Sequence, residues 1–193
     1  MNVDAIVIID KSIKNNFMII MYIYKIITNE YRTFSGYTGS GGVILRSLLC
    51  YVRCNAFRLI VWIRMRNLFP KYLYFIIERK FLKDFGVEIS RSAIIGERLR
   101  IAHLPGIVIG NGVKIGNDCI LYQGVLIGQS HGKYPTLGNN ITICANTCVL
   151  GDIRIGDNVI ILANSVVTHD IPANSIVAGI PAKVIKDKGN LNV

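Results

Sequence analysis

Two features of the 193-residue sequence predict a mainly β fold, a parallel β-coil preceded by α-helices. From about Val87 onward, aliphatic residues recur at every sixth position, and glycine often follows them. A period of six fits neither an α-helix nor a long strand, but it fits short strands joined by tight turns. Residues 43–69, by contrast, contain no proline and read as a helix that ends at Pro70.

The six-residue repeat predicts the shape of the coil. Three units close a triangular turn of about 18 residues, and successive turns stack about 4.8 Å apart as parallel strands. Residues 87–171 supply roughly four to five turns, enough for a continuous core. The aliphatic series are Ile95, Ile101, Ile107; Ile109, Ile115, Leu121, Ile127; and Leu137, Ile143, Val149, Ile155, Ile161, Val167. We expect glycine or asparagine at the corners because they tolerate unusual backbone dihedrals.

The repeat is interrupted twice. Two extra residues fall between Ile107 and Ile109, and four fall between Ile127 and Leu137. An insertion in a regular coil must leave it as a bulge or a loop, and functional residues concentrate in such segments. Two of the three histidines, at positions 103 and 131, lie at or beside these interruptions.

The positive charge is concentrated in the first half of the chain. The formal net charge is +10, which taken alone resembles a nucleic-acid-binding protein. Residues 1–85, however, carry 13 Lys and Arg against 5 acidic residues, whereas residues 86–193 carry 9 against 7. We therefore expect no nucleic-acid partner, and any electrostatic function must belong to the N-terminal segment.

The cysteines and the apolar runs argue against several protein classes. Five cysteines without a CxxC pair or neighbouring histidines favour reduced thiols, so no metal site is expected. The most apolar run near the start, residues 17–24, is much shorter than the roughly 20 residues that a transmembrane helix needs. No signal-peptide cleavage motif follows it, and we expect a cytoplasmic protein.

Four stretches of the second half, taken in order, resemble the hexapeptide-repeat acyltransferases, and most of all their serine acetyltransferase branch. They read GVEISRSAIIG, IAHLPGIVIG, KIGNDCILYQGVLIG and NSVVTHDIPANSIVAGIPAKVI. The resemblance implies a left-handed β-helix acyltransferase domain over 86–186, between an N-terminal helical segment (1–85) and a C-terminal tail (187–193). It also implies a homotrimer that binds acetyl-CoA, as co-substrate, between neighbouring subunits.

His103 falls where this family places its general base, and Glu88 falls where the family has a supporting aspartate. An imidazole suits the removal of a proton from an acceptor hydroxyl. A carboxylate on the other ring nitrogen would fix its orientation. The two residues are 15 positions apart, close to one turn of the coil. The resemblance thus implies His103 and Glu88 as the catalytic residues, with a solvated corner carboxylate as the alternative for Glu88.

The resemblance also implies positions that bind acetyl-CoA. Ala145 and Ala163 are one turn apart, where the family's backbone contacts the pantetheine arm, and Thr168 and His169 follow. Lys183 falls where a basic residue approaches the nucleotide phosphate. The alternatives are a surface corner for His169 and a solvated lysine for Lys183.

The acceptor site departs from the family pattern. The family's Asp-His and Arg-His-Pro are replaced by Ala-His at 102–103 and Lys-Tyr-Pro at 133–135. This removes groups that would bind the amino and carboxylate groups of serine. We therefore expect a sugar acceptor in capsule, exopolysaccharide or O-antigen biosynthesis, contacted by His131, Lys133 and Tyr134. Serine O-acetyltransferase activity and a catalytically silent β-helix scaffold are the alternatives.

The N-terminal segment allows two interpretations. Arg46, Arg53 and Arg64 fall on one stripe of the helix expected over 43–69, among many apolar residues. Residues 72–82 read as a second short helix, and GYTGSGG, which precedes the first helix, reads as a flexible turn. These helices either cap the open end of the coil or form a basic amphipathic surface in peripheral contact with an anionic inner membrane.

Overall fold

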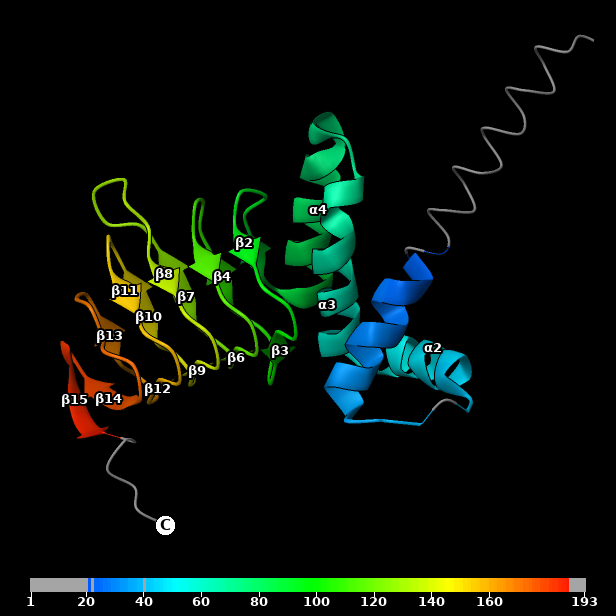
Figure 1. The fold of residues 1–193 in the computed structure, drawn as a ribbon. Helices are drawn as coiled ribbons and strands as arrows, with labels where there is room; N and C mark the ends of the chain where they lie inside the picture. Colours follow the sequence, from blue (N-terminus) through cyan, green and yellow to red (C-terminus); the bar gives the residue numbers. More distant parts are fainter. Residues whose placement is uncertain (1–20, 22, 40, 188–193) are drawn as a thin grey trace, which may run out of the picture.

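The computed structural model describes residues 21–187 except Tyr22 and Ser40, and it consists of a β-solenoid with helices at its N-terminal end (Figure 1). The solenoid has three sheets along its length: a five-stranded sheet (β1-β4-β7-β10-β13), a four-stranded sheet (β11-β8-β5-β2) and a six-stranded sheet (β15-β14-β12-β9-β6-β3). All pairings are parallel except that of β14 with β15. The strands are β1 (Glu88–Ile89), β2 (Ile94–Ile95), β3 (Arg100–Ile101), β4 (Val108–Ile109), β5 (Lys114–Ile115), β6 (Ile120–Leu121), β7 (Leu126–Gly128), β8 (Thr136–Leu137), β9 (Thr142–Ile143), β10 (Cys148–Leu150), β11 (Arg154–Ile155), β12 (Ile160–Ile161), β13 (Val166–Val167), β14 (Ser175–Gly179) and β15 (Ala182–Asp187).

The six-residue period has the physical origin that the sequence predicts. Most of the short strands place one aliphatic side chain inside the coil and its neighbour outside, as in β5, where Ile115 is buried and Lys114 is exposed. Strands one turn apart then stack their inward residues, for example Ile109 on Ile127 and Leu121 on Ile143. The predicted left-handed parallel β-helix behind a helical segment is confirmed.

The glycines that follow the aliphatic residues serve close packing rather than unusual dihedrals, which corrects one expectation. Gly116 and Gly138 lie outside the positive-φ positions of the described chain, whereas nearby corner residues such as Asn140 and Asn158 have φ of 53° and 59°. A Cβ built on Gly116 would instead overlap the carbonyl group of Gly138 in the next turn. Glycine is therefore required at this corner because two backbones approach closely.

The helical segment contains a break that the sequence did not signal. The single helix expected over residues 43–69 is wrong, because Cys54 is extended (φ −111°, ψ 109°) and separates two helices that pack in different places. The predicted stripe of Arg46, Arg53 and Arg64 is consequently split between them. The elements are α2 (Val43–Arg53), α3 (Asn55–Met65), η1 (Arg66–Leu68), η2 (Lys71–Leu73), α4 (Tyr74–Lys80) and the π-helical η3 (Phe81–Phe85), and residues 23–35 are also helical.

The helices nearest the solenoid share its hydrophobic core. Leu59 of α3 and Phe81 of η3 are fully buried in the cluster that contains Val87 and Ile89 of the first turn. Figure 1 shows α3 and α4 standing against this end, with α2 farther away. The helices therefore cover the open end of the first turn, as the cap interpretation predicts.

Within residues 21–187, Tyr22 and Ser40 excepted, no helix is long and apolar enough to cross a membrane. Most of the apolar run at 17–24 lies outside the described residues, as does nearly all of the C-terminal tail.

Candidate functional site

His103 lies on an insertion at a corner of the solenoid. The backbone N–H groups of Ala102 and Tyr122 make equivalent bonds to the next turn, donating to Leu121 and Ile143 at 2.8 and 3.0 Å. Gly124 N–H then donates to the carbonyl of Pro105 at 3.1 Å. Two residues, 103 and 104, are therefore extra between Ala102 and Pro105, and they leave the regular path of the coil.

The sequence placed this interruption a few residues too late, between Ile107 and Ile109. Ile107 is not in register with Ile101. It occupies a buried corner position that Val125 and Thr147 occupy in later turns. The error has a physical cause, because these corner positions also face the core and an aliphatic residue there mimics an inward strand position.

We call the corner between the six-stranded and five-stranded sheets the His103 corner. The exposed His103 ring lies 5.7 Å, centroid to centroid, from the ring of Tyr122 one turn away. Beside Tyr122, the side-chain oxygen of Gln123 is buried and accepts no hydrogen bond from any described residue. An exposed imidazole thus stands beside a buried and unpaired acceptor.

Small residues continue the His103 corner along the solenoid. Asn146 N–H donates to the carbonyl of Gln123, and Asn164 N–H donates to the carbonyl of Ala145, each at 2.9 Å. Ala145 and Ala163 are therefore stacked one turn apart below Gln123. Lys183 lies near the far end of this row, because β15 pairs it with Ala178, which stacks on Leu162 next to Ala163.

Glu88 lies beside the same corner without a described bond to His103. It is exposed on β1 opposite Val108, and the nearby Gly106 N–H donates to Gly86 at 2.8 Å. No hydrogen bond or ion pair between Glu88 and His103 occurs in the part of the chain that the structure describes. Their pairing therefore stays a prediction.

The other predicted site residues lie at a second corner, between the five-stranded and four-stranded sheets, which we call the loop corner. It carries the loop of residues 129–135 and, two turns later, Thr168 and His169. The two corners are opposite edges of the five-stranded sheet. Within a single copy of the chain, these residues therefore lie on a different corner from His103.

The loop is held down at two points. Lys133 Nζ donates to a carboxylate oxygen of Asp152 at 2.7 Å, and this contact raises the pKa of the lysine and lowers that of the aspartate. The ring of Tyr134 is partly buried over Gly112. His131 has φ 52°, and its Nδ1 is 3.0 Å from Ser130 Oγ.

Sequence reasoning assigned no role to Tyr122 or Gln123, although both belong to the YQGV stretch that carried the resemblance. Nothing in the sequence set these two residues apart, so only their place beside His103 reveals them. The described residues contain no group of three or more His, Cys, Asp or Glu side chains placed to hold a metal ion.

Residues 134–169 match the family described as bacterial transferase hexapeptide, six repeats. The six-residue period of the solenoid agrees with this match over these residues. The matched residues begin in the inserted loop and end at His169, so they cover the central part of the solenoid.

Several known proteins are similar to about half of this chain. Serine acetyltransferase of Synechococcus elongatus is 40% identical over 108 residues, which cover 54% of this chain and 44% of that protein. Serine acetyltransferase of Staphylococcus aureus is 45% identical over 108 residues, with 54% and 51% covered. This chain thus spans about half the length of these relatives.

Solved structures extend the likeness to the helical segment. The crystal structure of Neisseria gonorrhoeae serine acetyltransferase superposes with a TM-score of 0.74 at 28% identity, covering 87% of this chain and 68% of that one. A serine acetyltransferase in complex with CoA superposes with a TM-score of 0.63 at 32% identity, covering 67% and 56%.

The expected sugar acceptor of capsule, exopolysaccharide or O-antigen synthesis is contradicted by these relatives, which are serine acetyltransferases. The expectation depended on a few substituted residues. The structure gives two of them local structural roles, because Lys133 pairs with Asp152 and Tyr134 packs on Gly112. Their identity therefore does not indicate a different acceptor.

Proposed function

We propose that the chain is an acetyl-CoA-dependent serine O-acetyltransferase with His103 as general base. The observation that carries the proposal is the position of His103. It stands exposed on an outward insertion, at the head of a row of small residues. The names of the relatives and the CoA complex of a structural neighbour support the donor and the acceptor.

In this reaction His103 moves a single proton. It accepts the proton of the serine hydroxyl as the oxygen attacks the thioester carbonyl carbon. When the C–S bond breaks, the imidazolium returns this proton to the departing sulfur, so the products are O-acetylserine and the free thiol of CoA. The described inter-coil hydrogen bonds leave the N–H groups of His103 and Leu104 unused, and these groups are candidate donors to the oxyanion.

The His103 corner fits an extended thioester arm. Ala145 and Ala163 leave space along the corner, and the unpaired oxygen of Gln123 offers an acceptor to an amide N–H, the group that a pantetheine arm contains. Lys183, exposed at the end of the row, would attract the phosphates. Glu88 is proposed as a positioning residue that orients the imidazole.

The separation of the two corners supports a site shared between copies. Residues of the loop corner, namely His131, Lys133, Tyr134, Thr168 and His169, can approach His103 only from a neighbouring chain. Rings of three or more copies place one edge of each copy against a different edge of the next. We therefore propose a homotrimer, which sedimentation measurements can identify by mass.

Incubation of the protein with acetyl-CoA and serine is expected to release free CoA thiol. Because Ala102 stands where the family has an aspartate, Ala102→Asp is expected to lower the KM for serine about ten-fold with little change in kcat, since a charged hydrogen bond contributes roughly 1.5–3 kcal/mol. If the protein binds CoA but adding serine releases no CoA thiol, the serine proposal is contradicted. Absence of both release and CoA binding would favour the silent scaffold.

A peripheral contact with an anionic membrane is a second, separate proposal, supported by α2. Its outer face carries Ile44, Leu45, Leu48, Leu49 and Val52, each between 44% and 65% exposed. The helix has no acidic residue, and its two arginines are exposed. An apolar face flanked by arginines is typical of helices that lie in a membrane interface.

Flotation with vesicles tests this contact. The protein is expected to float with vesicles that contain phosphatidylserine. A variant with both Leu48→Asp and Val52→Asp is expected not to float, because the two substitutions place charges on the apolar face. No flotation of the unmodified protein would overturn the proposal. If the double variant instead has a different oligomer mass, the apolar face of α2 is an interface between copies of the chain.

A further inference from the structure

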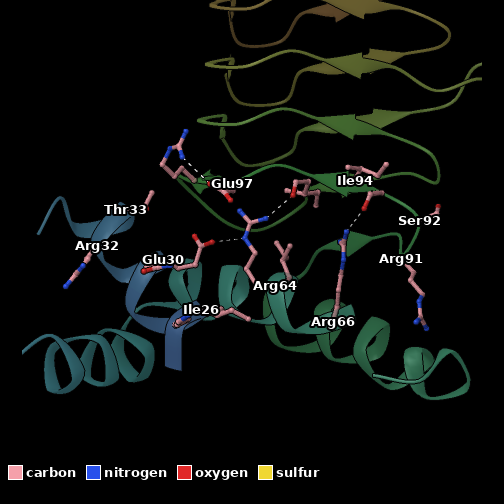
Figure 2. A pocket seen from close by; sticks show the side chains of 16 residues that line it. Ile26, Glu30, Arg32, Thr33, Arg64, Arg66, Arg91, Ser92, Ile94 and Glu97 are labelled. Carbon is pink, nitrogen blue, oxygen red and sulfur yellow. Dashed lines mark hydrogen bonds and ion pairs between the residues drawn. The ribbon is translucent and has the colours of Figure 1, made fainter. Parts of the chain in front are cut away.

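A cavity of about 830 Å³ lies between the helical segment and the first solenoid turn, on the side of the four-stranded sheet. Figure 2 shows its walls: the helix of residues 23–35 on one side, the end of α3 with η1 below, and β2 with its flanking turns above. The cavity is separate from the His103 corner, whose residues do not line it. It therefore belongs to no part of the proposed reaction.

The lining of this cavity is strongly cationic. Six basic residues and two acidic residues line it, and both acids already have partners. Glu30 binds Arg64 at 2.7 Å, and Glu97 lies 3.3 Å from Arg98, which also holds Asp118. The basic lining residues are Lys25, Arg32, Arg64, Arg66, Arg91 and Arg98, of which Arg32 points away in Figure 2.

Arg66 is a buried cation without a counter-charge. The residue is only 3% exposed, and its Nη2 donates to the carbonyl of Ala93. Its Nε and Nη1 have no hydrogen-bond partner among the described residues, and it forms no ion pair there. Burial lowers the pKa of this guanidinium. An unpaired charge in a protein interior costs several kcal/mol, which a bound anion would offset.

Arg91 provides a second incompletely paired guanidinium beside the first. Its Nη2 donates to the carbonyl of Phe69 at 3.2 Å, and its buried Nη1 has no partner in the described chain. It stacks on the ring of Tyr74 at 5.2 Å, and the same phenol also interacts electrostatically with Arg66. Arg66 and Arg91 thus both lie near Tyr74, and their side chains point in different directions in Figure 2.

We propose that this cavity binds a phosphate-type oxyanion through Arg66 and Arg91. Guanidinium groups recognise phosphate by charge-assisted hydrogen bonds, and an oxyanion in the cavity would be attracted by the positive charges of both residues. Because the cavity walls come from helices and solenoid alike, the bound ion would fasten the helical cap to the first turn. The site is distinct from the acceptor and donor sites, and the proposal does not depend on the enzymatic activity.

The test compares thermal unfolding in sodium phosphate and in sodium chloride at equal ionic strength. Saturating phosphate is expected to raise the Tm of the unmodified protein by about 4 °C or more over chloride. Arg66→Met is expected to fold, since replacing a buried charge by an apolar side chain of similar length is often tolerated, and to lose this response. Lys186→Met, which removes an exposed lysine of β15, is the control and should keep the response of the unmodified protein.

Calorimetric titration with inorganic phosphate supplies the second measurement. Arg91→Gln removes a less buried guanidinium and is expected to weaken phosphate binding at least ten-fold, so the proposal can be judged even if Arg66→Met fails to fold. The proposal is overturned if phosphate and chloride give the same Tm for the unmodified protein. It is equally overturned if Arg91→Gln and any folded Arg66→Met bind phosphate as tightly as the unmodified chain.

Discussion

Replacing His103 by alanine is expected to lower kcat for acetyl transfer by about 10²–10⁴-fold, because general-base catalysis by a positioned imidazole contributes about that much. The Tm should change little, since the side chain is exposed on an insertion and is not part of the core. The measurement is the rate of CoA thiol release at saturating acetyl-CoA and serine, together with thermal unfolding of the same sample.

Two further variants sharpen this result. Lys114→Ala removes an exposed side chain from the four-stranded sheet and should retain full activity. Glu88→Gln should lower kcat less than His103→Ala does and leave the KM for serine unchanged, if Glu88 acts only through the imidazole. A His103→Ala enzyme that keeps more than a tenth of the rate would show that another residue accepts the proton.

Gly116→Ala is expected to destabilise the solenoid by about 2–3 kcal/mol, near the upper end of the range for overpacked interiors. The new Cβ would overlap the carbonyl group of Gly138, and backbone in a stacked coil cannot move aside as a flexible side chain can. For a chain of this length the Tm should fall by roughly 5 °C or more.

Gly128→Ala is the matched control for this substitution. A Cβ on Gly128 would lie 3.7 Å from the side chains of Leu126 and Leu150, an ordinary contact distance. Its Tm should therefore stay close to that of the unmodified protein. Equal losses of stability in the two variants would mean that coil spacing is not what requires glycine at position 116.

The solenoid was predictable from sequence because its period is local. Each six-residue unit repeats the same inward aliphatic residue, so the pattern of Ile115, Leu121 and Ile127 defines the coil without knowledge of distant contacts. The break at Cys54 was not predictable, because no glycine or proline marks it. Packing of α3 against the first turn, a tertiary contact, accompanies the change of direction there.

The candidate site was predictable in part. The interruption of the period drew attention to His103, and the hydrogen-bond pattern then placed it on the extra residues themselves. The cavity at Arg66 left no signal in the sequence, because it depends on a helix end and a solenoid turn coming together. The assignment of the loop residues to the same site stays a prediction, because a linear motif does not show which corner its residues occupy and one copy of the chain places them on a different corner from His103.

The loop of residues 129–135 has a consequence for how such proteins diversify. The strands on both sides of it keep their register with the next turn, as β7 does with β10 and β8 does with β11. Its length and composition can therefore change without disturbing the stacking that stabilises the fold. Evolution, or a protein engineer, can therefore vary this loop and retain the His103 corner on the opposite edge of the sheet.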